Sequence, residues 1–193
     1  QLLKKLESFI SKYYKNLLLK GALYFVAASL LFFITISAIE HFGNFGVFIR
    51  TFLFWLLIIV NSIIVWKWIL VPLKGLYRIG ESLSHQEAAR IIGEHFPKVQ
   101  DKLLNLLQLT SLSAEENELV HASIQQKSKG LSSISFSKAI DFSENKKHLK
   151  YTLFPIGILL FLFFSGNKIV LTESSARILS HNTHFEPTAP LNL

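Results

Sequence analysis

Two long apolar stretches, separated by a short polar break, dominate the pattern of the chain. Residues 21–39 carry no charged side chain over 19 positions, and residues 51–66 form a second uncharged stretch of 16. At a rise of ~1.5 Å per residue, the first is long enough to cross the ~30 Å hydrocarbon core of a bilayer as a helix. Such stretches are rare in soluble domains of this size, so the pattern predicts a transmembrane helical hairpin rather than two buried core helices.

Basic and aromatic residues mark where these spans meet the lipid headgroups. The second stretch reaches spanning length by continuing past Lys67, whose amine can extend to the headgroups while the flanking tryptophan rings lie at the interface. This predicts a first span at 21–40, a loop at 41–50 and a second span at 51–73. The predicted interface residues are Lys20, Trp66, Lys67, Trp68, Lys74, Lys150 and Tyr151.

A third apolar stretch begins at Tyr151. Its 15 residues up to Ser165 are few for a span, but Ile169, Val170 and Leu171 extend the apolar surface. Pro155 is expected near the start of this helix, where proline costs least. We predict a third span at 151–171; the alternative is a re-entrant or peripheral helix, which would keep residues 172–193 on the side from which the helix enters.

Residues 1–20 have the pattern of an amphipathic helix. Leucines and aromatic residues recur at helical spacing, and lysines occupy the remaining positions. Such a helix lies along an anionic leaflet or packs on a partner protein, and the pattern favours neither alternative.

Lysine and arginine counts predict the orientation. The first 20 residues hold five, residues 41–49 hold none, residues 67–150 hold twelve, and two follow the third stretch. By the positive-inside rule, the N-terminus and residues 74–150 are cytoplasmic and residues 172–193 lie on the opposite side.

Composition agrees with a membrane protein and excludes several chemistries. Half of the residues are apolar, 13% are aromatic and the mean hydropathy is +0.38. The absence of cysteine excludes disulfides and thiolate sites, and the absence of methionine indicates a piece of a longer chain. The net charge of +7 is distributed as the positive-inside rule describes for membrane proteins. In residues 74–150, eleven basic residues alternate with nine acidic ones, which is typical of a solvated face, so we expect no nucleic-acid partner.

The polar segment 74–150 predicts short helices. Ser84 and Glu87 form a capping box that opens one helix, and Pro97 opens a second that ends near Leu109. A second capping box at 113–116 predicts a third helix ending near Lys129, before Gly130. Apolar residues between 134 and 142 fit an extended strip or a membrane-surface helix. Because these helices are short, they must pack on one another, on the ends of the spans or on a partner.

Few residues suggest chemistry. Asn61, at membrane depth, predicts a contact within the hairpin or with another subunit, whereas Ser29, Thr35 and Ser37 are expected to bond to their own helix. Glu40 lies at the edge of a span, and no acidic residue or histidine lies deep in one, which weighs against a proton relay.

Two groups of polar residues have a chemical and an inert interpretation. His181, His184 and Glu186 could meet at one metal, but no further ligands accompany them, so a solvated linker is favoured. Glu94 and His95 could form an acid–base pair, although such neighbours at a helix end are usually inert. Residues 43–46 lack the lysine and following helix of a phosphate-binding loop. We therefore expect no enzyme activity and no cofactor.

Residues 87–109 resemble a signature in a family of large, uncharacterised bacterial inner-membrane proteins, catalogued as a domain of unknown function and sometimes labelled ATPase. The matching positions are Arg90, Gly93, Phe96, Pro97, Asp101, Leu104 and Asn105. Residues 173–179 and 185–190 look like the family's exit from its third span. The resemblance implies a bacterial inner-membrane location and an N-terminal anchor, followed by a large periplasmic part with β-sandwich-like and coiled regions. It also implies a gene that lies near genes for MoxR-type ATPases and von Willebrand A-domain membrane proteins, which suggests a role in envelope assembly or quality control; no catalytic residue is carried over.

The sequence thus predicts an all-α membrane protein with a transmembrane hairpin, a third span and a small cytoplasmic helical insert. The expected function is a non-enzymatic anchor or scaffold of a cell-envelope complex, with the lipid bilayer and other membrane proteins as partners. The alternatives are a transmembrane signalling protein and an accessory subunit of a transport or secretion machine.

Overall fold

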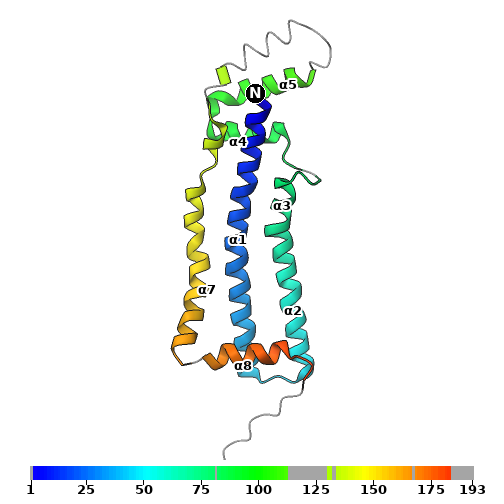
Figure 1. The fold of residues 1–193 in the computed structure, drawn as a ribbon, viewed down its shortest axis with the longest axis vertical. Coiled ribbons are helices and arrows are strands. Elements are labelled where there is room, and N and C mark those ends of the chain that lie inside the picture. Colours follow the sequence, from blue (N-terminus) through cyan, green and yellow to red (C-terminus); the bar gives the residue numbers. More distant parts are fainter. Residues whose placement is uncertain (1, 81, 113–129, 132–133, 167, 184–193) are drawn as a thin grey trace, which may run out of the picture. The chain divides into compact units, whose positions relative to one another are not determined.

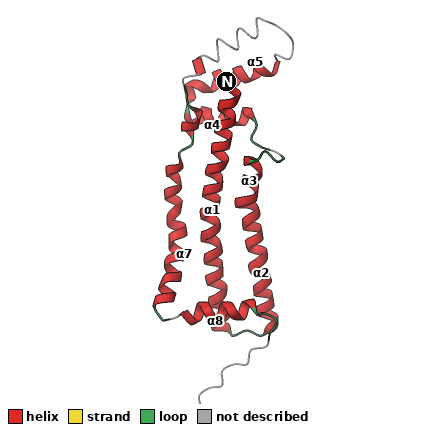
Figure 2. Cartoon of the chain, viewed as in Figure 1, coloured by secondary structure: helices red, strands yellow, loops and turns green. Residues whose placement is uncertain are grey.

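The computed structural model describes residues 2–80, 82–112, 130–131, 134–166 and 168–183 (Figure 1). Every regular element in these ranges is helical, and none is a strand (Figure 2). The elements are α1 (Leu2–Gly43), α2 (Val47–Val65), the π-helix η1 (Trp66–Leu70), α3 (Val71–Leu76), α4 (His85–His95), α5 (Pro97–Leu112), the 3₁₀ turns η2 (Phe136–Ala139) and η3 (Phe142–Asn145), α7 (Lys146–Phe164) and α8 (Lys168–Leu179). The predicted all-α fold is confirmed.

Three helical stretches are long and apolar enough to cross a membrane, namely Leu2–Gly43, Val47–Leu76 and Phe136–Phe164. At most 17% of the residues in the apolar window of each are buried inside the protein. The remaining apolar surface needs an apolar solvent, as the predicted membrane class requires.

The chain divides into two compact units. The apolar unit comprises Lys20–Leu70 and Asn145–Leu193, and the polar unit comprises Gln1–Leu19 and Val71–Glu144. Helix α1 contributes residues to both units, so the predicted boundary near residue 20 is not a break in the helix.

The hairpin turn of the apolar unit is shorter than the predicted loop at 41–50. Helix α1 ends at Gly43 and α2 begins at Val47, so Arg50 lies inside a helix. Asn44 has a φ of 42°, in the left-handed region that asparagine tolerates better than most residues.

The second apolar helix changes register at η1. Pro72 follows η1 and has no N–H to donate to the carbonyl of Trp68, four residues earlier, which accounts for the wider π-turn. That carbonyl faces α1 at Gly21, where an added Cβ would lie only 2.0 Å from the oxygen. Glycine is therefore required at this close approach of two helices.

The third apolar helix differs from its predicted span at both ends. Helix α7 already begins at Lys146, so Pro155 lies in its interior rather than near its start. It ends at Phe164, and Gly166, with a φ of +79°, reverses the chain. The predicted extension through residues 169–171 is wrong, because these residues belong to α8, which runs across the ends of α2 and α7 (Figure 1).

The polar unit has a hydrophobic core of its own. Leu6, Phe9 and Ile10 of α1 are buried there against α4, α5 and η2. Neither predicted environment of the N-terminal helix is therefore correct, since its apolar face packs on the chain's own helices rather than on a leaflet or a partner. A lysine of the same helix adds a polar contact to this packing, since Lys5 Nζ donates to the Ile134 carbonyl at 3.1 Å.

Two predicted helices of this unit are confirmed. Ser84 Oγ accepts from the Glu87 N–H at 3.2 Å, and Glu87 Oε2 accepts from the Ser84 N–H at 2.8 Å, which completes the capping box of α4. The bond from the Ser84 N–H to the Glu87 carboxylate, and after it the bond that Ser84 Oγ donates to Glu87 Oε2 at 2.9 Å, hold the pKa of Glu87 below its ordinary value. Pro97 opens α5, which extends to Leu112 rather than ending near Leu109.

Of the remaining predictions for residues 113–142, one lies outside the described residues and two are wrong. The second capping box and its helix, at 113–129, lie outside the described residues. Gly130 is helical and so does not end a helix. Residues 134–142 form neither an extended strip nor a surface helix, because the 3₁₀ turns η2 and η3 bury Phe136 and Ile140.

Candidate functional site

A buried ion pair joins the two helices of the hairpin beside its turn. Glu40 near the end of α1 and Arg50 in the first turn of α2 meet with Oε1 and Nε 3.1 Å apart. Their side chains are 0% and 4% exposed, which places a charged pair in the interior of the most apolar part of the chain. Charges next to a hydrocarbon phase are stable only when they are paired and turned inward, as here.

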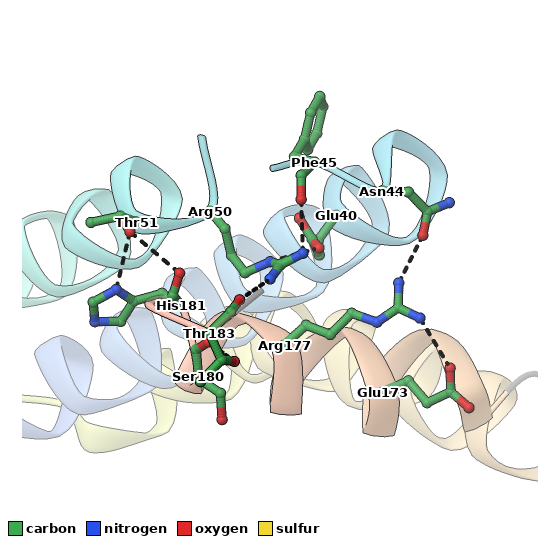
Figure 3. Close-up of polar contacts among 10 residues, drawn as sticks. All are labelled: Glu40, Asn44, Phe45, Arg50, Thr51, Glu173, Arg177, Ser180, His181 and Thr183. Carbon is green, nitrogen blue, oxygen red and sulfur yellow. Dashed lines mark hydrogen bonds and ion pairs between the residues drawn. The ribbon is translucent and has the colours of Figure 1, made fainter. Parts of the chain in front are cut away.

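Arg50 also connects the hairpin to the segment that follows α8. Its Nη2 donates to the Phe45 carbonyl at 2.7 Å, and its Nη1 donates to the Thr183 carbonyl at 3.1 Å (Figure 3). The planar guanidinium presents its donors in fixed directions, so a single side chain orients the turn, the helix end and the exit segment together.

Helix α8 is packed on the same end of the hairpin. Ile178 is buried with Ile36 of α1 and Leu53 of α2. Arg177 Nη1 donates to Asn44 Oδ1 at 2.7 Å, and its Nη2 lies 3.7 Å from Glu173 Oε2 (Figure 3). Apolar and polar contacts therefore hold α8 across the hairpin end.

His181, beyond α8, packs on α2 and does not behave as part of a solvated linker. Its ring stacks on Phe54 with centroids 4.3 Å apart, and its Nδ1 lies 3.1 Å from Thr51 Oγ1. The two other members of the suggested metal group, His184 and Glu186, lie outside the described residues.

Sequence reasoning missed this network, which we call the hairpin-end network (Glu40, Arg50, Phe45, Thr183 and α8). Glu40 was interpreted as a span-edge residue and Arg50 as part of a loop. The available signal was an acidic and a basic residue bordering the same turn between two apolar helices. Glu40 Oε2 and Ser37 Oγ, one helical turn apart, are buried without a hydrogen-bond partner among the described residues.

At the other end of the apolar unit, four rings from three elements meet. Tyr24 of α1 lies 5.4 Å from Trp68 of η1 and 5.2 Å from His148 of α7, between ring centroids, and Tyr151 lies 6.4 Å away. The Tyr24 hydroxyl is 2.9 Å from His148 Nδ1. We call this group the aromatic cluster.

Two lysines lie on the faces of these rings. Lys20 Nζ is 5.9 Å from the centroid of Tyr24, and Lys150 Nζ is 5.2 Å from that of Tyr151. At these distances a cation is attracted by the ring face. Of the predicted interface residues, Lys20, Trp68, Lys150 and Tyr151 are thus brought together, whereas Trp66 and Lys67 are exposed on η1 and Lys74 lies in the polar unit.

A cavity of about 400 Å³ opens beneath the aromatic cluster. It is lined by residues of α1 between 24 and 31, by Trp68, and by residues of α7 between 148 and 155. Ala27 and Ala28 leave space on α1 that a larger side chain would fill. The cavity therefore has an apolar interior and an aromatic rim, two of whose rings each hold a lysine on one face.

The polar residues at membrane depth bond mostly within their own helices. Asn61 Nδ2 donates to the Leu57 carbonyl at 2.9 Å, so the predicted contact with another helix or subunit stays a prediction. Thr35 bonds to the Leu31 carbonyl as expected, but the hydroxyl oxygens of Ser29 and Ser37 are buried and form no such bond.

The residues of the family-like motif build the α4–α5 corner of the polar unit. Gly93 is buried against Gln100, whose Cγ would lie 2.4 Å from an added Cβ, and Phe96 and Pro97 form the bend. Leu104 packs at the edge of the core. The exposed members are Arg90, Pro97, Asp101 and Asn105, and the neighbouring Glu94 and His95 are exposed as well.

Comparison with known proteins adds no relative, since no family model, curated protein or solved structure matches this chain. The resemblance of residues 87–109 to the inner-membrane family therefore stays a prediction.

Proposed function

We propose that the chain is a non-enzymatic membrane anchor that holds the segment following α8 at a fixed position on one face of a bilayer. The observation that carries this proposal is the bonding of Arg50, which joins Glu40, the turn at Phe45 and the exit segment at Thr183. A segment leaving the membrane beside such a network starts from a defined point.

The charges of the apolar unit support an anchor over a transporter. Among the described residues, the buried charged side chains are Glu40 and Arg50, which neutralise each other at one end of the hairpin. A proton or ion pathway would need polar groups along the length of the spans. We therefore infer a scaffold role in a cell-envelope complex, with partner proteins bound by the polar unit or by the outer faces of the spans.

The orientation of the chain in the membrane is part of the same proposal. The lysine distribution supports a cytoplasmic location for the polar unit and a periplasmic location for α8 at a bacterial inner membrane. The family resemblance of residues 87–109 supports the same location.

Single cysteines test the orientation, because the natural chain has none. Lys102→Cys in α5 and Asn182→Cys beyond α8 both replace exposed residues. In intact spheroplasts we expect a membrane-impermeant maleimide to label Asn182→Cys directly and Lys102→Cys only after permeabilisation. Equal labelling of both variants before permeabilisation would overturn the anchor topology.

Limited proteolysis tests whether the exit segment is held. In proteoliposomes, Arg50→Gln is expected to speed tryptic cleavage after Arg177, because the segment after α8 loses its bond to the hairpin at the Thr183 carbonyl and α8 keeps only its own contacts. Arg78→Gln is the matched control, since Arg78 is an exposed arginine that pairs with Glu7 in the polar unit. Equal cleavage rates in the natural chain and the Arg50→Gln variant would refute a role of this network in holding the segment.

A further inference from the structure

The cavity beneath the aromatic cluster is the feature of the described residues that the anchor role leaves unexplained. It combines about 400 Å³ of apolar space with a rim of polar rings and lysines. Binding sites for small molecules have this construction, in which an apolar volume receives the bulk of the ligand and a few polar groups orient it.

The charged residues of the helical segments around the cavity are all basic. Residues 20–39, 51–70 and 145–165 contain lysines at 20, 67, 146, 147 and 150 and no aspartate or glutamate. Lys20 and Lys150 are held over the rings of Tyr24 and Tyr151, on the two helices that line the cavity. A ligand at this rim is therefore expected to carry negative charge.

The depth of the cavity matches one leaflet of a bilayer. From Tyr24 to Leu31, helix α1 rises ~10 Å, within the ~15 Å half-thickness of the hydrocarbon core. Tyrosine and tryptophan rings favour the boundary between headgroups and acyl chains, which sets the aromatic cluster at that boundary and the cavity below it. An anionic group at the lysines would thus continue into an apolar chain in the cavity.

We propose that this cavity is a binding site for an anionic phospholipid. Its phosphate lies among Lys20, Lys150 and the hydrogen-bonded pair of Tyr24 and His148. One acyl chain follows Ala27, Ala28 and Leu31 between α1 and α7. The site is independent of the anchor role, since it needs neither the hairpin-end network nor a particular orientation.

Trp68 provides a reporter for this site because it lines the cavity. The two other tryptophans, Trp55 and Trp66, are more than half exposed, so a Trp55→Phe/Trp66→Phe chain is expected to keep the fold and leaves Trp68 as its single tryptophan. In proteoliposomes we expect phosphatidylglycerol with brominated acyl chains to quench Trp68 more strongly than brominated phosphatidylcholine at the same mole fraction. Equal quenching by the two lipids would overturn the proposal.

Charge variants separate a specific site from general surface attraction. Lys20→Gln/Lys150→Gln is expected to weaken the preference for phosphatidylglycerol about tenfold, since each basic residue at a membrane surface contributes several-fold to anionic-lipid binding. Lys146→Gln/Lys147→Gln also removes two positive charges, from exposed positions of α7 outside the proposed site, and is expected to leave most of the preference for phosphatidylglycerol. An equal loss in both variants would show surface attraction only and refute the site.

Two further measurements complete the test. Ala28→Phe fills the cavity and is expected to lower quenching by phosphatidylglycerol without changing the helical content measured by circular dichroism. Inorganic phosphate should not relieve the quenching, because a free phosphate lacks the acyl chain. If phosphate displaces the brominated lipid, or if Ala28→Phe leaves the quenching unchanged in a folded protein, the phospholipid site is wrong.

Discussion

The two units of this chain bury opposite kinds of side chain. In the polar unit, apolar residues such as Phe9, Ile92 and Leu103 are enclosed, and charged residues such as Arg90 and Asp101 are exposed. In the apolar unit, Phe154 and Phe161 are more than half exposed, while Glu40 and Arg50 are enclosed.

The contrast shows that each unit is organised by the solvent it needs. Water drives apolar side chains into a core, so the polar unit is stabilised by the hydrophobic effect. Lipid is as apolar as leucine and supplies no such force, so close packing and inward-facing polar contacts hold the apolar unit. The same substitution should therefore have different consequences in the two units.

The largest effect is expected from breaking the buried ion pair. Arg50→Leu leaves the Glu40 carboxylate enclosed without a counter-charge, which should lower the free energy of unfolding by about 3–5 kcal/mol. The double variant Glu40→Leu/Arg50→Leu removes both charges and should cost much less. Unfolding of each variant in mixed micelles measures both values, and a double variant as unstable as Arg50→Leu would contradict this explanation.

A leucine truncated in each unit gives the most direct comparison. Leu103→Ala opens a cavity in the core of the polar unit, where Leu103 is fully buried, and should cost about 2–5 kcal/mol. Leu160→Ala lies on α7, where the side chain is 53% exposed, and should change the stability in lipid far less. Hydrogen exchange measured separately in α5 and α7 would show this, and equal losses would mean that Leu160 is not in contact with lipid.

Two glycines sharpen the role of close packing in the apolar unit. Gly21→Ala places a methyl group against the Trp68 carbonyl, a backbone atom that a rotamer change cannot move, so we expect a cost of about 1–3 kcal/mol. Gly157→Ala on α7 meets nothing within 4 Å and should be neutral or slightly stabilising. Thermal unfolding in detergent distinguishes them, and an unchanged midpoint for Gly21→Ala would refute the close approach.

The smallest effect concerns the acid sensitivity of the polar unit. The pKa of Glu87 is lowered in the folded chain by hydrogen bonds to Ser84, so its contribution to stability is complete above the ordinary value of 4.5 and is lost as the pH falls through the lowered folded pKa. Glu87→Gln keeps a side chain for the capping box but does not titrate. The protection factors for hydrogen exchange of residues 84–95 should therefore fall at low pH more in the natural chain than in the variant; an identical fall would exclude this contribution.

Local patterns predicted the elements well but not their environments. The apolar stretches predicted the membrane-spanning helices, and Ser84, Glu87 and Pro97 marked the starts of α4 and α5, because these signals act within one or two helical turns. The same logic failed after Phe164, where Gly166 turns the chain and three apolar residues continue in α8 instead of α7. Hydropathy counts apolar residues without registering such a reversal.

By itself, the amino-acid sequence determined that the chain is helical and that it needs lipid, because spacing, capping and hydropathy are properties of neighbouring residues. Only the tertiary structure decided that the N-terminal helix is part of a protein core, that Glu40 meets Arg50, and that Tyr24 meets His148 to cover a cavity. The residues in each of these contacts come from different helices, and helix periodicity does not specify which faces of separate helices pack together.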